Sequence, residues 1–327
     1  MEKIYTINLS ELEGLEKEEI YDLLKEKLHL PNYCGTNLDA LYDALTEMGE
    51  CNINIVDCRE NPDSIKGCAT DNIGSDSSVP KKGESYIDKI RKVFEDAADL
   101  NPDINLSIIS GKYISKYISL YDYEYKKGRH YLNASRRSPD KLVYTKSSKE
   151  FKEMIPDAVS CFVIVDNEMY DEPRLLLSNE YRYPTGQFLL SVPAGLIDAN
   201  DADSKETLGG KELSPCEKAA VREIKEETGI ALSDKDVIKT VNPLVFSTPG
   251  MTDESNALVS VVIRSDIKDQ LSQEGAEGSE LFDGFEILTK EEAKKILKQG
   301  VDNNGIFYSV YTCIALMYFV SDMWTEE

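Results

Sequence analysis

The chain has 327 residues, of which 41% are hydrophobic, so it is long enough for two domains that each bury a core. Its formal net charge of -23 argues against a nucleic-acid-binding surface such as one for DNA, and favours a basic protein partner, a metal ion or simple solubility. Seven cysteines without a Cys-x-x-Cys pair predict neither a disulfide framework nor a zinc site. Since no apolar run reaches the length of a membrane span and the first residues lack a signal-peptide core, we expect a cytoplasmic protein without a membrane segment.

The first third of the chain predicts alternating strands and helices. Residues 3–8 alternate as a short strand, and the leucines of residues 15–28 have helical spacing. After a loop, residues 38–46 predict a helix with its leucines on one face. Three further elements follow: a strand at Cys51–Val56, a helix at Tyr86–Leu100 and a strand at Ile104–Ser110. Residues 61–84, rich in Asp, Ser, Gly and Pro, predict a mobile loop.

The polar face of the 38–46 helix carries acidic and aromatic residues. Asp39 and Asp43 stand one turn apart, with Tyr42 beside them and Tyr33 on the preceding loop. Such a face alone is typical of a solvated helix surface. However, the string LPNYCGTNLDALYDALT closely resembles barstar, the small inhibitor that blocks the active site of a secreted basic ribonuclease.

The barstar resemblance covers about the first 110 residues and implies a small α/β domain with a short parallel sheet. It also implies a basic barnase-like ribonuclease as partner, bound by five residues: Tyr33, Asp39, Tyr42, Asp43 and Asp96. Two of these depart from the family pattern, because Tyr42 stands where a tryptophan is familiar and Asp96 where the family has a glutamate.

A second domain is expected over residues 111–327. Lys112–Tyr125 alternates, KKGRH turns and Tyr131–Arg137 follows, which predicts a hairpin. Residues 159–165 and 173–178 predict compact apolar strands, and VNPLVFS predicts another. A closing helix is expected to bury four apolar side chains: Ile306, Val310, Ile314 and Met317.

Between these strands, the string SPCEKAAVREIKEETGI predicts a helix with both ends marked. Ser214 suits the N-cap, Pro215 suits the first helical position, and Gly229 can adopt the left-handed conformation that ends a helix. Three residues recur every four positions as an expected buried stripe: Cys216, Ala220 and Ile224.

The neighbouring face of this helix crowds three carboxylates: Glu223, Glu226 and Glu227. Like charges at a spacing of three or four residues repel, so this face favours a compensating cation. A hard divalent metal such as magnesium, which prefers oxygen ligands, is the natural candidate. For three glutamates alone, a solvated acidic face is the alternative.

The string REIKEETGI resembles the second half of the Nudix box at all seven specified positions. The upstream glycine of the box is best matched by Gly195, which lies farther from Arg222 than in the family, and an insertion within DANDADSKETLGGKEL explains the difference. The first glutamate of the box has no clean match, since Ser214 and Cys216 fall near its place and Glu212 is the nearest acid.

The flanking strings EYRYP, VPAGLID and PGMTDE are similar to the ADP-ribose pyrophosphatase branch of the Nudix hydrolases. This resemblance implies an α/β/α sandwich with a mixed sheet and a homodimer formed through this domain. It also implies Mg²⁺- or Mn²⁺-dependent cleavage of the pyrophosphate in a nucleoside diphosphate derivative, with ADP-ribose giving AMP and ribose 5-phosphate.

The same resemblance implies roles for individual residues. The metal ligands would be the carbonyl of Ala194 with Glu223, Glu226 and Glu227, and Arg222 would orient a carboxylate. The substrate would contact Arg182 and Arg136 through its phosphates and Tyr131 through its adenine. Glu254 and Glu280 compete as the catalytic base, and Glu254 is preferred because it follows a Pro-Gly turn directly after a strand, whereas Glu280 lies in a broadly acidic run.

The sequence therefore predicts two alternative functions. The first is a Nudix hydrolase fused to a barstar-like domain. The alternative is a ribonuclease inhibitor whose Nudix domain has become a nucleotide sensor, although the intact string EIKEE favours the hydrolase. Because the motifs lie in different thirds of the chain, inhibition and hydrolysis do not exclude one another.

Overall fold

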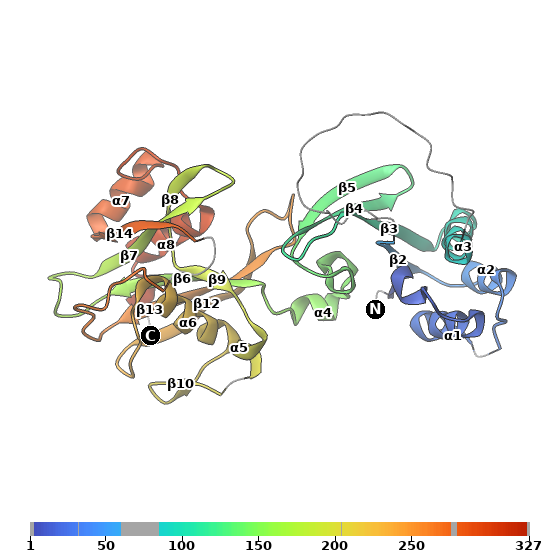
Figure 1. Ribbon diagram of the computed structural model, residues 1–327, viewed down its shortest axis with the longest axis horizontal. Coiled ribbons are helices and arrows are strands. Elements are labelled where there is room, and N and C mark those ends of the chain that lie inside the picture. Colours follow the sequence, from blue (N-terminus) through green and yellow to red (C-terminus); the bar gives the residue numbers. More distant parts are fainter. Residues whose placement is uncertain (1–2, 32, 60–84, 204, 276–279, 326–327) are drawn as a thin grey trace. The chain divides into compact units, whose positions relative to one another are not determined.

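A computed structural model describes residues 3–31, 33–59, 85–203, 205–275 and 280–325. The chain forms two compact units (Figure 1). The first unit comprises residues 1–154 with Thr248–Asp253, and the second comprises residues 155–247 and 254–327. The loop predicted at residues 61–84 lies outside the described residues. In the described ranges every helix is too short or too polar to cross a bilayer.

The first unit is built on a five-stranded mixed sheet. Its strands, in spatial order, are β1 (Ile4–Asn8), β2 (Cys51–Asp57), β3 (Ile104–Tyr113), β4 (Ser119–Lys126) and β5 (Arg129–Ser135). β1, β2 and β3 are parallel, and β4 and β5 add an antiparallel hairpin. The domain boundary expected at residue 110 falls within β3. Because the hairpin continues the same sheet, the compact division comes after residue 154 instead.

The helices of this unit are α1 (Lys17–Leu28), α2 (Leu38–Thr46), α3 (Tyr86–Leu100) and the short α4 (Ser148–Lys152). The first three pack on one face of the sheet, where Leu24, Leu41 and Phe94 meet Ile7 and Ile53 (Figure 1). A smaller core on the other face contains Val56, Ile109, Tyr121, Tyr123 and Leu142. The predicted strands and helices of the first third are therefore confirmed.

The second unit contains a seven-stranded mixed sheet. Its strands are β6 (Ala158–Val165), β7 (Arg174–Arg182), β8 (Gln187–Ser191), β9 (Ala194–Leu196), β12 (Val237–Phe246), β13 (Ser255–Ile263) and β14 (Phe282–Leu288). The main order is β12-β13-β6-β7-β14, while β8 pairs with β7 and β9 with β6. Among the described strand pairs of this sheet, only β13 and β6 are parallel. A separate hairpin joins β10 (Thr207–Leu208) to β11 (Lys211–Glu212).

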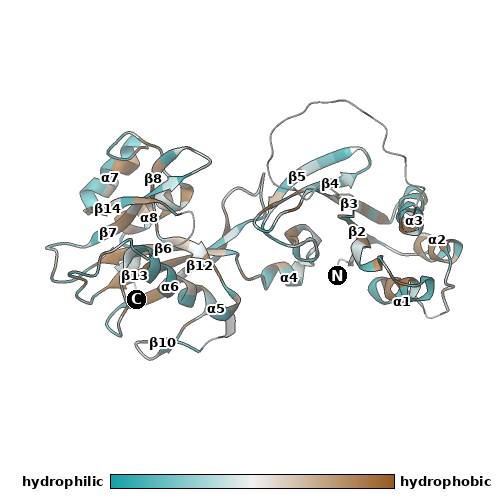
Figure 2. Cartoon of the chain, viewed as in Figure 1, coloured by the Kyte–Doolittle hydropathy of each residue, from teal (hydrophilic) through white to brown (hydrophobic). Residues whose placement is uncertain are grey.

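Helices cover both faces of this sheet. They are α5 (Ala199–Asp203), α6 (Pro215–Thr228), α7 (Lys290–Gln299) and α8 (Val310–Val320). Along β6, Cys161 and Val163 pack with α6, whereas the alternate residues Phe162 and Ile164 pack with α7 and α8. Figure 2 shows hydrophobic colouring through these central strands. The expected α/β/α sandwich is therefore confirmed.

The prediction of the buried face of α8 was wrong. Val310 and Met317 are 51% and 59% exposed, and Ile306 precedes the helix. The fully buried positions include Thr312 and Leu316 instead. Because nearly every residue of VYTCIALMYFV is apolar, the sequence pattern does not distinguish one face from the other.

Candidate functional site

Helix α6 has the capped ends that its sequence predicts. The Ser214 hydroxyl accepts a hydrogen bond from the Glu217 amide at 3.3 Å, and the Glu217 carboxylate accepts one from the Ser214 amide at 3.0 Å. Pro215 occupies the first turn, and Gly229, at φ 76°, ends the helix in the left-handed conformation. These local interactions fix where the helix begins and ends, and therefore which residues its acidic face presents.

Two carboxylates of that face are buried. Glu223 and Glu227 stand one turn apart, and Glu226 beside them is half-exposed. Burial raises the pKa of Glu223 to about 7, although Arg222 acts to lower it. Burial also raises the pKa of Glu227 to about 9. Both carboxyl groups are therefore harder to ionise than a free glutamate, and a cation bound beside them would favour their ionised forms.

Arg222 connects these acids to β9 and α5. Its Nη1 donates to Glu223 Oε1 at 2.7 Å and to Glu226 Oε2 at 3.2 Å. Its Nη2 donates to the Leu196 carbonyl at 2.8 Å and to Asp201 Oδ2 at 3.2 Å. The planar guanidinium can thus fix the rotamers of its carboxylate partners. Its orienting role in catalysis stays a prediction.

The short strand β9 lies against the same acids. The Ala194 amide donates to Glu227 Oε1 at 3.2 Å. A Cβ atom added to Gly195 would lie 1.9 Å from Glu223 Oε1 and 2.0 Å from its Cδ. The close approach of Glu223 to the backbone therefore requires glycine at this position, which is the glycine that the sequence comparison with the Nudix box selected.

The sequence prediction missed Asp201. This buried residue of α5 lies six positions after Gly195 and accepts from Arg222 as described above. Asp201 lies within the stretch DANDADSKETLGGKEL, where the sequence analysis placed the insertion, so the search for an acid close to Arg222 did not reach it. Two residues that the sequence analysis weighed for the first glutamate of the box have other positions: Ser214 caps α6, and Glu212 is exposed on β11.

Glu180, on β7, is a second residue that the sequence prediction missed. Arg182 Nη2 lies 2.6 Å from Glu180 Oε2. Burial raises the pKa of Glu180, and the charge of Glu280 raises it further. Glu280 likewise adds to the raised pKa values of Glu223 and Glu227, for which burial is the larger cause. Arg182, Glu180 and Glu280 therefore lie near the acidic face of α6.

The two candidate bases occupy different surroundings. Glu280 is an exposed residue just before β14 whose charge acts on the buried acids of α6. Glu254 is half-buried just before β13, and its charge acts on Tyr311 of α8, whose pKa is raised mainly by burial. The choice between the two bases stays a prediction.

The acidic face of α6 offers oxygen donors of the kind that a hard divalent cation prefers. Across the described ranges, no group of three acidic, histidine or cysteine side chains is already arranged to hold a metal ion. The donor types nevertheless fit a hard divalent cation, since Glu223 and Glu227 offer buried carboxylate oxygens one turn apart. Arg222 donates to Oε1 of Glu223 and to Oε2 of Glu226, so it contacts one oxygen of each of these carboxylates.

Two predicted substrate-binding residues belong to the first unit. Tyr131 lies on β5, and its hydroxyl donates to the Gly250 carbonyl at 2.6 Å. Arg136 is an exposed residue just after this strand. Because both belong to a different compact unit from Glu223, their contact with substrate stays a prediction.

The predicted ribonuclease-binding patch lies on exposed parts of the first unit. Tyr33 is 89% exposed, and Asp39, Asp43 and Asp96 are exposed on α2 and α3, while Tyr42 is half-buried. Tyr33 and Asp43 also line a cavity of about 450 Å³, together with other residues that include His29, Pro31 and Glu47. The inhibitory use of this surface stays a prediction.

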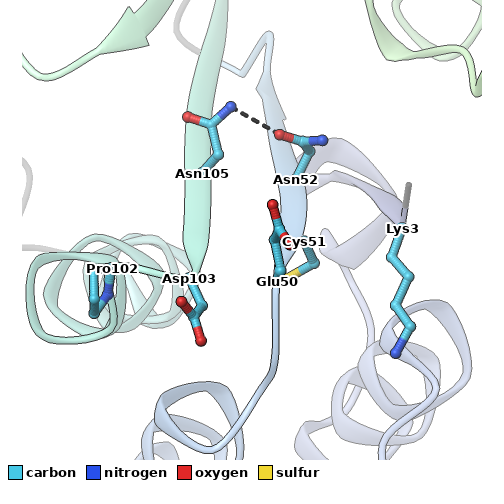
Figure 3. Close-up of a pocket in the computed structure, with 7 residues that line it drawn as sticks. All are labelled: Lys3, Glu50, Cys51, Asn52, Pro102, Asp103 and Asn105. Carbon is cyan, nitrogen blue, oxygen red and sulfur yellow. Dashed lines mark hydrogen bonds between the residues drawn. The ribbon is translucent and has the colours of Figure 1, made fainter. Parts of the chain in front are cut away.

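A second cavity of the first unit, of about 620 Å³, is more polar (Figure 3). It is lined by Lys3, Glu50, Cys51, Asn52, Pro102, Asp103 and Asn105. The Asn105 amide donates to the Asn52 side-chain oxygen at 2.8 Å within it. Because the cavity lies where the parallel strands begin, and ligands of parallel sheets usually bind at the opposite ends, we assign it no role.

Comparison with known proteins identifies partial relatives. The chain is 34% identical over 119 residues to the putative nudix hydrolase 2 of Caenorhabditis elegans, covering 36% of this chain and 45% of that protein. It is 33% identical over 107 residues to the ADP-ribose pyrophosphatase of Saccharomyces cerevisiae, covering 33% and 39%. It is 31% identical over 110 residues to the ADP-sugar pyrophosphatase of Mus musculus, covering 34% and 42%. The matched regions thus span less than half the length of each of these proteins.

Family models match both parts of the chain. Residues 3–104 match the model described as Barstar (barnase inhibitor). Residues 154–308 match the model of the NUDIX domain, which includes β9, α6 and the buried acids described above. The chain therefore carries a barstar domain followed by a NUDIX domain.

Proposed function

We propose that this chain is a hydrolase that cleaves the pyrophosphate of a nucleoside diphosphate derivative, with ADP-ribose giving AMP and ribose 5-phosphate. The observation that carries the proposal is the pair of buried carboxylates, Glu223 and Glu227, with the backbone of Gly195 against the first of them. The similarity to an ADP-ribose pyrophosphatase and an ADP-sugar pyrophosphatase supports this substrate class.

A bound Mg²⁺ or Mn²⁺ would neutralise negative charge on the pyrophosphate as the bond breaks. The residues that would hold it are Glu223, Glu226, Glu227 and the carbonyl of Ala194. Arg222 Nη1 donates to one oxygen of Glu223 and one of Glu226, and it would orient both carboxylates toward the cation.

The remaining groups bind substrate and move a proton. Arg182 extends from the end of β7 beside Glu180 and would bind a phosphate oxygen. A carboxylate, Glu280 or Glu254, would accept a proton from the attacking water. Glu280 is favoured because its charge already acts on the buried acids.

The test is hydrolysis of ADP-ribose by the full chain with magnesium, followed by chromatography of AMP. Glu227→Gln should remove most activity and leave the fold intact, because it removes a ligand charge at nearly constant volume. Glu212→Gln, an exposed change outside the site, is the matched control. Full activity of a folded Glu227→Gln protein would contradict the metal assignment, and nucleotide binding without hydrolysis by the parent would favour the sensor alternative.

We also propose that the barstar domain binds a basic barnase-like ribonuclease through its exposed patch. Clustered carboxylates steer an oppositely charged partner, so the association rate should fall as salt rises. Asp43→Ala should weaken binding by several kcal/mol, on the order of 2–5. Asp22→Ala, an exposed change on α1, is the control. Equal binding by the Asp43 variant and the parent would remove the inhibitory assignment.

The homodimer through the NUDIX domain also stays a proposal. Sedimentation of the full chain measures it directly, and a monomer at micromolar concentration would contradict it.

A further inference from the structure

Glu180 and Arg182 project from β7 onto the face of the sheet that α6 covers. On this strand, Leu176 packs in the same core cluster as Ile224 of α6, whereas Leu175 packs in the cluster of α7 and α8. Because side chains alternate along a strand, the even-numbered residues of β7 share the α6 face. Glu180 and Arg182 therefore continue the row of side chains that leads from the core toward the buried acids.

The carboxylate of Glu180 is held from two sides. Arg182 Nη2 lies 2.6 Å from Glu180 Oε2, and the Ser191 side chain of β8 hydrogen-bonds to the same carboxyl group. The Glu180 side chain is only 12% exposed, while that of Arg182 is 47% exposed. The acid is therefore anchored in the sheet, and the guanidinium extends from it toward solvent.

The charge of Glu180 acts on one of the proposed metal ligands. Burial is the main cause of the raised pKa of Glu227, and the charge of Glu180 adds to it. A nearby buried acid increases the repulsion among carboxylates, and the ion pair with Arg182 offsets this charge. An exposed ion pair would serve surface stability equally well without placing its carboxylate among like charges.

The donor geometry of the guanidinium suits a phosphate group. Arginine has five N–H donors in a planar fork, and Glu180 engages Nη2. The other donors remain able to bind the paired oxygens of a phosphate, which guanidinium groups commonly grip with two parallel hydrogen bonds. Glu180 holds the guanidinium plane of Arg182 in place before substrate binds. The Arg182 side chain therefore loses less conformational entropy on binding.

We propose that Glu180 is a positioning residue of the NUDIX site, whose ion pair holds the Arg182 guanidinium in the orientation that binds the pyrophosphate oxygens of a nucleoside diphosphate substrate. This inference rests on the proposed function. It predicts that Glu180 acts through Arg182, so that the effects of changing the two residues are not additive.

The experiment is a double-mutant cycle on the full chain with Glu180→Gln, Arg182→Ala and the combined variant. Glu180→Gln keeps the shape of the side chain and removes its charge. It should raise the KM for ADP-ribose about tenfold, the effect of weakening one charged hydrogen bond, with kcat within about twofold of the parent. In the Arg182→Ala background the same change should have little further effect on KM.

Controls separate positioning from folding. Thermal unfolding of each variant and the exposed change Glu212→Gln report general damage, and Glu180→Asp, which keeps the charge, should recover part of the lost affinity. An active parent with an unchanged KM in Glu180→Gln, or additive effects in the cycle, would overturn this inference alone. A parent that hydrolyses no nucleoside diphosphate derivative would overturn both this inference and the proposed function.

Discussion

Gly195→Ala should remove most hydrolysis without unfolding the protein. The added Cβ would meet Glu223 Oε1 at 1.9 Å, whereas ordinary contact begins at 3.4 Å, so the oxygen must retreat by 3.4 − 1.9, or about 1.5 Å. A displacement of about 1 Å at a reacting centre can cost 10²-fold in rate. We therefore expect kcat/KM to fall about 100-fold, which corresponds to about 2.7 kcal/mol of transition-state stabilisation.

Stability should change little in this variant, because the clash involves the end of a flexible side chain and Gly195 does not adopt a left-handed backbone conformation. The assay combines steady-state ADP-ribose hydrolysis with thermal unfolding. Gly49→Ala is the matched control, since nothing lies within 4 Å of its added Cβ. A folded Gly195→Ala protein that retains activity within about threefold of the parent would refute the assignment of Glu223 to the site.

Two further predictions concern the base and the stability of the first unit. Glu280→Gln should lower kcat by roughly two orders of magnitude and Glu254→Gln by much less; the reverse result in the same hydrolysis assay would restore the ranking from sequence. Asp57→Asn should destabilise the first unit by about 3–5 kcal/mol in urea unfolding, because this 3%-exposed carboxylate pairs with Arg59 and Arg91. Burial alone would raise the pKa of Asp57, but these arginines hold that pKa below its ordinary value. The contribution of Asp57 to the free energy of unfolding should therefore be present at pH values above its pKa in the unfolded chain. It should be lost as the pH falls through its pKa in the folded protein. Equal acid stability of parent and variant would contradict this.

Local signals explain which elements the sequence predicts well. The ends of α6 depend on Ser214, Pro215 and Gly229, which act within one helical turn, so the helix could be placed from its own residues. The buried face of α8 could not be predicted in this way. Apolar residues occur on every side of this helix, and only its contact with the sheet determines which side is buried.

The parts of the site that sequence missed depend on contacts between distant segments. Asp201 reaches Arg222 across an insertion that includes the β10–β11 hairpin, and this insertion disturbs the spacing used to find it. Glu180 pairs with Leu189 on β8 and with Phe282 on β14, so strands flank it on both sides. Neither partner strand is evident from the string EYRYP, so its glutamate resembles any polar residue at a strand end.

The predicted boundary at residue 110 falls inside β3, a central strand of the sheet of the first unit. β3 pairs with the barstar strand β2 on one side and with β4 on the other. Farther along, the Ala134 amide of β5 donates to the Met251 carbonyl, and Ala134 forms a parallel bridge with Thr252. The segment Thr248–Asp253, which connects β12 to β13, is therefore bound to the sheet that the barstar strands extend. A chain cut at residue 110 would leave β4 without β3, and the hairpin that holds this connecting segment would become an isolated ribbon, which is only marginally stable in water.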